Sequence, residues 1–318
     1  MYPMKLTGVT RSPIWGGTRL PLEWKKGTDC ETVGESWELT VRRDGECRVE
    51  NGAFAGRFLR DVIGENRDGV LGASTGDADS FPLLIKLLDA ADVLSVQVHP
   101  NDEYAARVEN DRGKTEMWYI VEADEGAQII CGLRDGVDGK MLAEAVEKNR
   151  VEDVLCHIPV HAGECYFIPA GLPHAIGKGI LIAEIQQNCD LTYRVYDYNR
   201  RDKNGNTREL HVKKALDVIR PFSAQEIERI RYSRTGDVRD GLLADCEYFR
   251  VERIVSDGEA RLNRSTRMGH LLCISGEGVL YSDGLAYDVH RGDGYLIPAA
   301  CPEVRFCGKA TLIYTEAY

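Results

Sequence analysis

Short apolar runs, interrupted by glycine, proline, asparagine or aspartate, make up much of the chain. Turn residues at this spacing predict β-strands. The strand-like runs, in chain order, are GESWELTVRR, LLIKLLD, LSVQVHP, EMWYIVEA, AQIICGL, GECYFIPAG, GILIAEIQQN and LTYRVYDY. Helical spacing of apolar residues is rarer and occurs in EYAARVEN, DGKMLAEAVEKN and ELHVKKALDVIR. Many short strands with few helices favour a mainly β fold, a sandwich or barrel, over alternating βαβ units.

A weak internal repeat suggests two related β-units. The segment GECYFIPAGLPHAI, residues 163–176, resembles GDGYLIPAACPEVR, residues 292–305, since each has Gly, five residues, Pro and a turn. Strand-like sequence precedes both copies. We place the border in the charged stretch 223–245, which predicts one domain over 1–222 and a smaller one over 223–318.

The run LSVQVHP raises a specific question. On a strand, Ser95, Gln97 and His99 share one face, because side chains alternate with a period of two. An ordinary half-buried strand turns such a face to water, and a solvated strand end is one interpretation. The other is a pair of metal ligands, an amide and an imidazole. This stretch alone does not decide between them.

Composition narrows the function classes. The chain has 318 residues, 43% hydrophobic, with a formal net charge of −11 and no basic run, so nucleic acid is not expected as a partner. No apolar run is long enough for a membrane span, and the start lacks a signal-peptide core. Ten cysteines are spread singly without a CxxC pair, which favours free thiols in a cytoplasmic protein and disfavours thiolate zinc sites. The seven histidines are then the soft metal ligands to consider.

The unit at 163–174 fits the spacing G-x5-P-x-G-x2-H and resembles the second motif of the cupin jelly-roll family. Its histidine is His174. The first cupin motif normally supplies two histidines and a glutamate, and here Gln97 and His99 stand where that pair belongs, with Glu116 seventeen residues after His99. This resemblance implies two cupin β-units with a few short helices.

Five blocks extend the resemblance beyond the fold. FPLLIKLLDA, LSVQVHPND, GKTEMWYIVEA, IPAGLPHAIGKGILIAEIQQ and TYRVYDYNR together resemble type I mannose-6-phosphate isomerases of the short bacterial form. The resemblance implies an aldose–ketose isomerase that interconverts mannose 6-phosphate and fructose 6-phosphate through an enediolate. It also implies one zinc ion per chain, held by Gln97, His99, Glu116 and His174. Iron or manganese could use the same ligands, and Gln97 could be an outer residue instead of a direct ligand.

The same resemblance assigns the remaining site residues. Arg194 matches the active-site arginine of the family, although a surface salt bridge is the ordinary alternative. Lys86 and Ser95 match positions associated with the phosphate. Arg200 stands where the family has a further lysine, which keeps the charge and changes its geometry.

The general base is left open by the sequence. Lys114 precedes Glu116 by two positions and would share its strand face, and a neighbouring divalent cation would favour its neutral form. Glu184 and Asp197 are the competing candidates.

The second repeat departs from the ligand pattern, with Glu303 where the histidine would stand. We expect the C-terminal β-unit to be metal-free and His270 and His290 to be structural or exposed. Two other functions remain open: a non-catalytic metal cupin that binds sugar phosphate, and an iron-dependent cupin oxygenase. The sequence does not indicate the oligomeric state.

Overall fold

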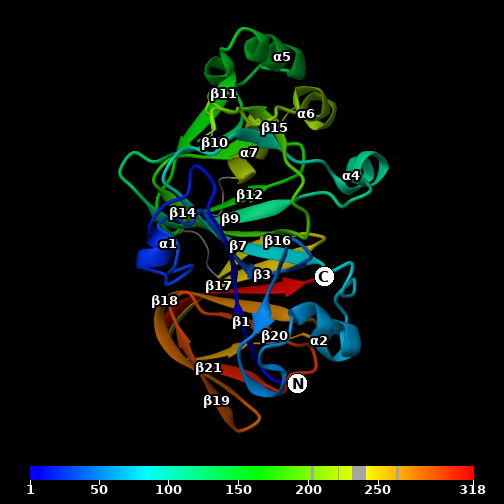
Figure 1. Cartoon of the computed structure of the whole chain (residues 1–318), viewed down its shortest axis with the longest axis vertical. Coiled ribbons are helices and arrows are strands. Elements are labelled where there is room, and N and C mark those ends of the chain that lie inside the picture. Colours follow the sequence, from blue (N-terminus) through cyan, green and yellow to red (C-terminus); the bar gives the residue numbers. More distant parts are fainter. Residues whose placement is uncertain (202–203, 221, 231–240, 263–264) are drawn as a thin grey trace. The chain divides into compact units, whose positions relative to one another are not determined.

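The structure is a computed structural model that describes residues 1–201, 204–220, 222–230, 241–262 and 265–318 (Figure 1). Part of the predicted border stretch 223–245 lies outside these residues. The mainly β fold is confirmed, and none of the helices in the described ranges has the length and apolarity needed to cross a membrane.

Contacts divide the chain into two compact units. The first unit comprises Met1–Arg11, Arg19–Leu87 and Val238–Tyr318, and the second comprises Ser12–Thr18 and Leu88–Asp237. This division differs from the predicted domains 1–222 and 223–318. The reason is non-local pairing, since the strand Met4–Thr7 pairs in register with Gly294–Ile297.

The second unit holds two groups of strands and most of the longer helices. Its elements are β8 (Val96–Val98), α4 (Asp102–Glu109), β9 (Glu116–Ala123), β10 (Gln128–Leu133), α5 (Gly139–Glu147), a 3-10 turn (Val151–Val154), β11 (Leu155–Pro159), β12 (Cys165–Ile168), β13 (His174–Ile176), β14 (Ile180–Gln187), β15 (Tyr193–Tyr196), α6 (Val212–Val218) and α7 (Ala224–Ile230). One sheet has the order β11-β10-β13-β8-β15, and β12, β9 and β14 are neighbours in another.

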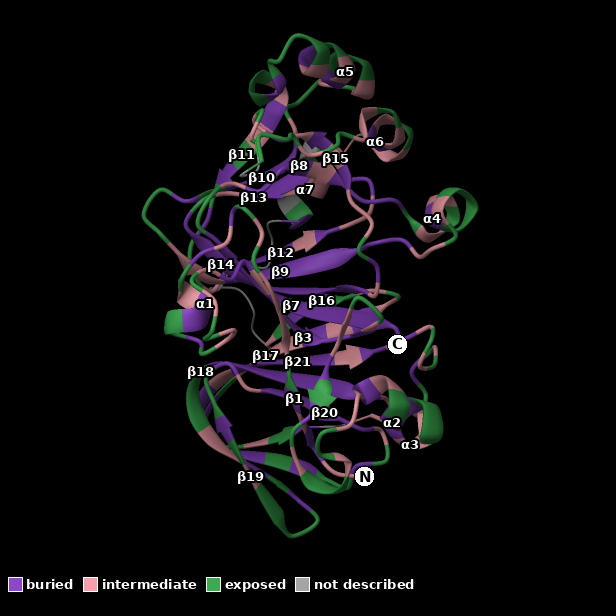
Figure 2. Cartoon of the chain, in the orientation of Figure 1, coloured by how far each residue is buried: buried purple, intermediate pink, exposed green. Residues whose placement is uncertain are grey.

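These two groups of strands enclose an apolar core, as expected of a jelly roll. Trp118 and Ile120 of β9, Ile182 of β14, Ile129 of β10 and Ile176 of β13 all belong to it. Alternate residues of the five-stranded sheet face a second core that α5 and α6 cover. Both faces of that sheet are therefore buried (Figure 2).

The first unit is built mainly on long antiparallel strands. Its elements are β1 (Met4–Thr7), β2 (Val9–Arg11), α1 (Arg19–Leu22), β3 (Glu35–Leu39), β4 (Val41–Arg42), β5 (Gly45–Glu46), β6 (Arg48–Val49), a 3-10 turn (Gly52–Phe54), α2 (Leu59–Glu65), α3 (Arg67–Leu71), β16 (Leu242–Asp245), β17 (Phe249–Leu262), β18 (Gly269–Ser282), β19 (Leu285–His290), β20 (Gly294–Ile297) and β21 (Val304–Ala317). Strand β7 (Leu83–Ala90) contains the border between the units. Residues of β18 to β21 form the apolar core of the first unit.

Candidate metal centre and active site

Period-two alternation places the candidate ligands between the two groups of strands of the second unit. Glu116 lies two residues before Trp118 on β9, and His174 lies two before Ile176 on β13, so each continues an inward-facing row. On β8, Val96 and Val98 face the helix-covered core, which leaves Gln97 to the opposite face. The polar face of LSVQVHP is therefore mostly buried.

Strand register brings the neighbouring residues together. Gln97 of β8 pairs directly with His174 of β13 and with Arg194 of β15. A tight turn leads into β13, where Gly171 has a positive φ of 86° and its N–H donates to the carbonyl of His99 at 2.9 Å. Glycine suits that backbone conformation because it has no Cβ.

His99, Glu116 and His174 form a compact cluster. They are buried, and their ligand atoms lie within 4.8 Å of one another. The two Nε2 atoms are 3.1 Å apart. Glu116 Oε1 is 3.4 Å from His174 Nε2, and Oε2 is 3.6 Å from His99 Nε2.

Backbone carbonyls fix the tautomers of both imidazoles. His99 Nδ1 is 2.8 Å from the carbonyl oxygen of Leu191, and His174 Nδ1 is 2.8 Å from that of Leu172. A carbonyl only accepts, so each Nδ1 carries the proton and donates. Burial lowers the pKa of His174 to about 3, so its ring is neutral and Nε2 presents a lone pair.

This arrangement fits a divalent cation. Two imidazole lone pairs and a carboxylate converge on one buried point, and that concentration of acceptors is repulsive without positive charge. Within the described residues, neither carboxylate oxygen of Glu116 accepts a hydrogen bond. Two neutral imidazoles and a carboxylate are also a ligand set that transition metals favour.

Lys114 lies directly beside this cluster. Its Nζ is 2.6 Å from Glu116 Oε2, the distance of an ion pair although not the alignment of a hydrogen bond, and 3.1 Å from His99 Nε2. The side chain is nearly fully buried. The structure thus brings Lys114 to the ligands, as the sequence predicted.

Gln97 lies at the edge of the cluster. Its Nε2 is 3.5 Å from His174 Nε2, so the amide faces that imidazole with its donor. Rotation of the terminal amide by half a turn would present Oε1 in the same place. Gln97 can thus act as an outer hydrogen-bond partner or as an oxygen ligand.

Glu184 of β14 is another buried carboxylate near the cluster. Strand register places it opposite Trp118, whose Nε1 donates to Glu184 Oε1 at 3.1 Å. Its charge favours the protonated form of His174, an effect that burial of that ring outweighs. Glu184 therefore faces the same interior as the metal-ligand candidates.

Arg194 is held on the strand next to Gln97. Its Nε donates to Ser95 Oγ at 3.2 Å, and its Nη1 donates to the carbonyl of Glu209 at 2.9 Å. Burial lowers the pKa of Arg194, and the positive charge of Arg208 adds to this effect. Among the residues that the structure describes, no acid forms a salt bridge with Arg194, so the surface salt bridge considered as the alternative is not what the structure shows.

A cluster of charges accompanies Arg194. Asp197 accepts from Arg200 Nη2 at 2.5 Å and from Arg208 Nε at 2.7 Å. Burial raises the pKa of Asp197, but hydrogen bonds from Arg208 and Arg200 outweigh it and keep the pKa below its usual value. A carboxylate stabilised in this way is a poor proton acceptor. Sequence reasoning missed Arg208, which comes eleven residues after Asp197 across a loop and belongs to none of the matched blocks.

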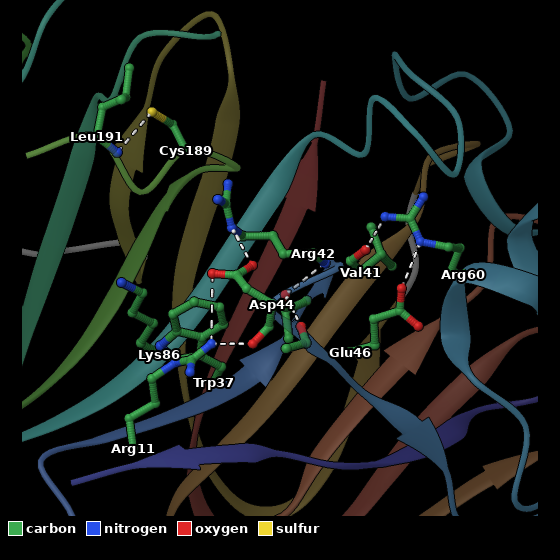
Figure 3. Close-up of polar contacts among 12 residues, drawn as sticks. Arg11, Trp37, Val41, Arg42, Asp44, Glu46, Arg60, Lys86, Cys189 and Leu191 are labelled. Carbon is green, nitrogen blue, oxygen red and sulfur yellow. Dashed lines mark hydrogen bonds and ion pairs between the residues drawn. The ribbon is translucent and has the colours of Figure 1, made fainter. Parts of the chain in front are cut away.

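Lys86 belongs to the first unit. Its Nζ is 3.6 Å from Glu35 Oε2 and 5.0 Å from the centre of the Trp37 ring, beside which it lies in Figure 3. The side chain is buried.

The C-terminal histidines differ in their environments. His270 is fully buried on β18, and burial lowers its pKa to about 3. His290 is exposed and lies near Asp293. Glu303 is also exposed, and its Oε1 lies 3.1 Å from Arg261 Nε. The only histidine and acid cluster that could hold a metal within the described ranges is His99, Glu116 and His174.

Comparisons with known proteins agree with this fold. The family described as "Phosphomannose isomerase type I, catalytic domain" matches residues 4–135, and "Mannose-6-phosphate isomerase, cupin domain" matches residues 241–316. The chain is 37% identical over 315 residues to mannose-6-phosphate isomerase ManA of Bacillus subtilis, covering 99% of this chain and 98% of that protein. It is 34% identical to mannose-6-phosphate isomerase of Streptococcus mutans, with the same coverage.

A solved structure shares the fold over the full length. The crystal structure of mannose 6-phosphate isomerase from Bacillus subtilis superposes with a TM-score of 0.89 at 35% identity, covering 99% of each chain. Fold and sequence together define a cupin protein, and the structure gives it a candidate metal site. The chain belongs to the type I mannose-6-phosphate isomerase family.

Proposed function

We propose that this protein is a zinc-dependent aldose–ketose isomerase that interconverts mannose 6-phosphate and fructose 6-phosphate. The observation that carries the proposal is the convergence of two imidazole lone pairs and the Glu116 carboxylate on one buried point. Relatives at 34–37% identity over nearly the whole chain bear the name of this activity.

One zinc ion per chain would be held by His99, Glu116 and His174, with Gln97 as the fourth ligand through Oε1. When bound, the ion supplies a Lewis acid for the substrate carbonyl and stabilises negative charge on the sugar oxygens. Nitrogen and oxygen ligands without thiolate suit zinc, and iron or manganese would accept the same set.

Isomerisation needs a group that moves a proton between C1 and C2. We assign this role to Lys114 Nζ, which lies beside the ligands with its side chain buried. Glu184 is the second candidate because its carboxylate faces the same interior. Asp197 is not proposed, since Arg200 and Arg208 keep it ionised.

The phosphate group needs cations, because the protein as a whole is negative. Arg194 of β15 donates to Ser95, the residue that precedes β8, and the two form a hydrogen-bonded pair within the second unit. We propose that Arg194 binds developing negative charge or phosphate, and that Ser95 and Arg200 complete this anion site. The assignment of Lys86 to the phosphate rests on the family resemblance alone.

We further propose a cytoplasmic location and a structural, metal-free role for the C-terminal β-unit. All ten cysteines are free, which agrees with a reducing compartment. Among the described residues of the first unit, His270 belongs to no group of side chains that could hold a metal.

The proposal is tested by metal analysis of purified protein together with turnover of mannose 6-phosphate before and after chelation. We expect about one zinc per chain, loss of turnover on chelation and recovery on adding zinc back. Zinc binding without turnover would indicate a non-catalytic sugar-phosphate cupin. Bound iron with oxygen consumption would indicate an oxygenase, since iron oxygenases use the same two-histidine, one-carboxylate ligands.

A further inference from the structure

One glutamine, Gln187, forms hydrogen bonds both with the backbone of the segment that carries Lys114 and Glu116 and with a neighbouring carboxylate. Gln187, the last residue of β14, is almost completely buried. Its side-chain Oε1 accepts from the backbone N–H of Thr115 at 2.8 Å, and its backbone N–H donates to the Thr115 carbonyl at 3.1 Å. These two bonds fix the residue between Lys114 and Glu116.

The other end of the same amide meets a carboxylate. Gln187 Nε2 donates to Asp102 Oδ1 at 3.1 Å and lies 3.3 Å from Oδ2. Asp102 Oδ1 also accepts from the N–H of Gly113 at 2.8 Å. A Cβ at Gly113 would lie 2.5 Å from the Asp102 backbone nitrogen, so the two segments approach as closely as only glycine permits.

The donors and acceptors of this bridge have a fixed direction. Thr115 N–H can only donate and the Asp102 carboxylate can only accept, so the Gln187 amide has one orientation. A further bond from Lys114 N–H to the Pro100 carbonyl, at 3.0 Å, connects the segment to the residue after His99. A backbone hydrogen bond therefore joins the segment that carries Glu116 to the residue next to His99, another metal-ligand candidate.

We propose that Gln187 and Asp102 are positioning residues that hold Lys114 and Glu116 at the metal centre. Neither is assigned a contact with the ion or the sugar. They act through the backbone of residues 113–115, and the inference rests on the metal centre proposed above. Groups that orient metal ligands in this way typically contribute 10–100-fold to metal affinity or activity.

A reciprocal exchange of the two side chains tests the bridge. Gln187→Glu places two carboxylates together, and Asp102→Asn removes the charge that Gln187 Nε2 contacts. In the double variant Q187E/D102N, the new carboxylate can accept from Thr115 N–H and from the new amide, whose oxygen can accept from Gly113 N–H. The pattern of donors and acceptors and the total charge are restored.

The first readout is zinc affinity, measured by competition with a chromophoric chelator. The second is amide hydrogen exchange of residues 113–116 in metal-free protein. We expect each single variant to bind zinc about 10–100-fold more weakly and to exchange faster. The double variant should return to within about threefold of the parent affinity, given the usual scatter of additive effects. Glu103→Gln is the control, because it removes an exposed charge from the same first turn of α4.

Parent-like affinity and exchange in both single variants would overturn the proposal. So would a double variant as impaired as the sum of the two. If a single variant fails to fold, the double variant still decides, since it either regains zinc binding or does not. Neither readout requires isomerase turnover, so a parent that binds zinc without isomerising the sugar would refute the proposed activity and leave this test intact.

Discussion

The imidazoles of the metal centre are oriented by main-chain carbonyls and not by carboxylates. The carbonyl of Leu191 accepts the hydrogen bond from His99 Nδ1. Leu191 lies in a turn after β14, and its own backbone N–H donates to Cys189 Sγ at 3.4 Å (Figure 3). Gln186 Nε2 donates to the Cys189 carbonyl in the same turn. Each carbonyl accepts from Nδ1, so Nε2 is the ring nitrogen that faces the candidate metal site.

Replacing His174 with alanine tests the ligand assignment directly. The variant leaves no side-chain atom at this position that could bind a metal, so we expect bound zinc to fall from about one per chain to a small fraction. Elemental analysis after dialysis against a weak chelator measures this. His157→Ala is the control, because His157 lies on β11 of the same unit and pairs with Glu152 at the surface. Equal zinc in parent and His174→Ala would remove His174 from the ligand set.

Arg194 offers a second test at this scale. If it stabilises transition-state charge, Arg194→Ala should lower kcat by at least about a hundredfold with zinc content retained. Arg194→Lys should recover only part of the loss, because lysine keeps the charge and loses the planar fork. Steady-state kinetics of mannose 6-phosphate turnover separate the outcomes. A raised KM with unchanged kcat would make Arg194 a phosphate anchor.

Arg150→Ala is the matched control for Arg194, because Arg150 forms an exposed pair with Asp153 and such pairs are worth little. Parent-like kinetics in Arg194→Ala would remove the catalytic assignment.

Among the elements, the turn between β12 and β13 has a steric requirement that bears directly on the candidate site. Gly171 combines a positive φ with a close neighbour, since a Cβ there would lie 2.9 Å from the Val218 carbonyl oxygen. The same turn sets the position of His174 through Leu172 and contacts His99 through its N–H. One short segment therefore sets both the backbone conformation of the turn and the positions of two metal-ligand candidates.

Gly171→Ala should therefore lower the free energy of unfolding by more than the conformational cost of a positive φ alone. A positive φ costs an L-residue roughly 1–2 kcal/mol, and the contact with Val218 adds to it. Gly126→Ala is the control, because Gly126 has a φ of 77° and open space around it. We expect denaturant unfolding of Gly171→Ala to show the larger loss of stability, together with weaker zinc binding. Equal losses in the two variants would show that the Val218 contact contributes nothing.

The local sequence pattern predicted the helices and strands better than it predicted which segments contact one another. The apolar runs gave β9, β10, β12, β14 and β15, and the helical spacing gave α4, α5 and α6, because period and turn residues are local properties. LSVQVHP forms a strand only over Val96–Val98. The Asp197 and Arg208 pair was not predictable, because it depends on how a loop returns.

For the whole molecule, the division into units was the main difference from the sequence-based prediction. Strand β1 pairs with β20 and β6, which joins the start of the chain to the C-terminal cupin unit. Such pairing over nearly 300 residues leaves no local signal in the sequence. The site itself was better predicted, since His99, Lys114, Glu116 and His174 meet within the second unit.

The buried His270 makes the stability of the protein depend on pH, independently of the candidate metal centre. His270 is fully buried, and Lys26, which pairs with Glu38 at 2.7 Å, adds to the effect of burial on its pKa. Its pKa is about 3 in the folded protein and about 6.5 when unfolded, so the unfolded chain binds the extra proton between these values. Stability from this group is therefore complete above pH 6.5 and is lost as the pH falls toward 3.

We therefore expect the free energy of unfolding to fall by about 1–2 kcal/mol more in the parent than in His270→Leu between pH 7 and pH 5. The comparison isolates His270, because His174 and the other titrating groups are common to both proteins. Calorimetric unfolding at several pH values measures the difference, and His290→Ala is the control because its side chain is exposed. Identical pH slopes in parent and His270→Leu would contradict a neutral buried imidazole. Loss of zinc from His270→Leu would contradict a metal centre confined to the second unit.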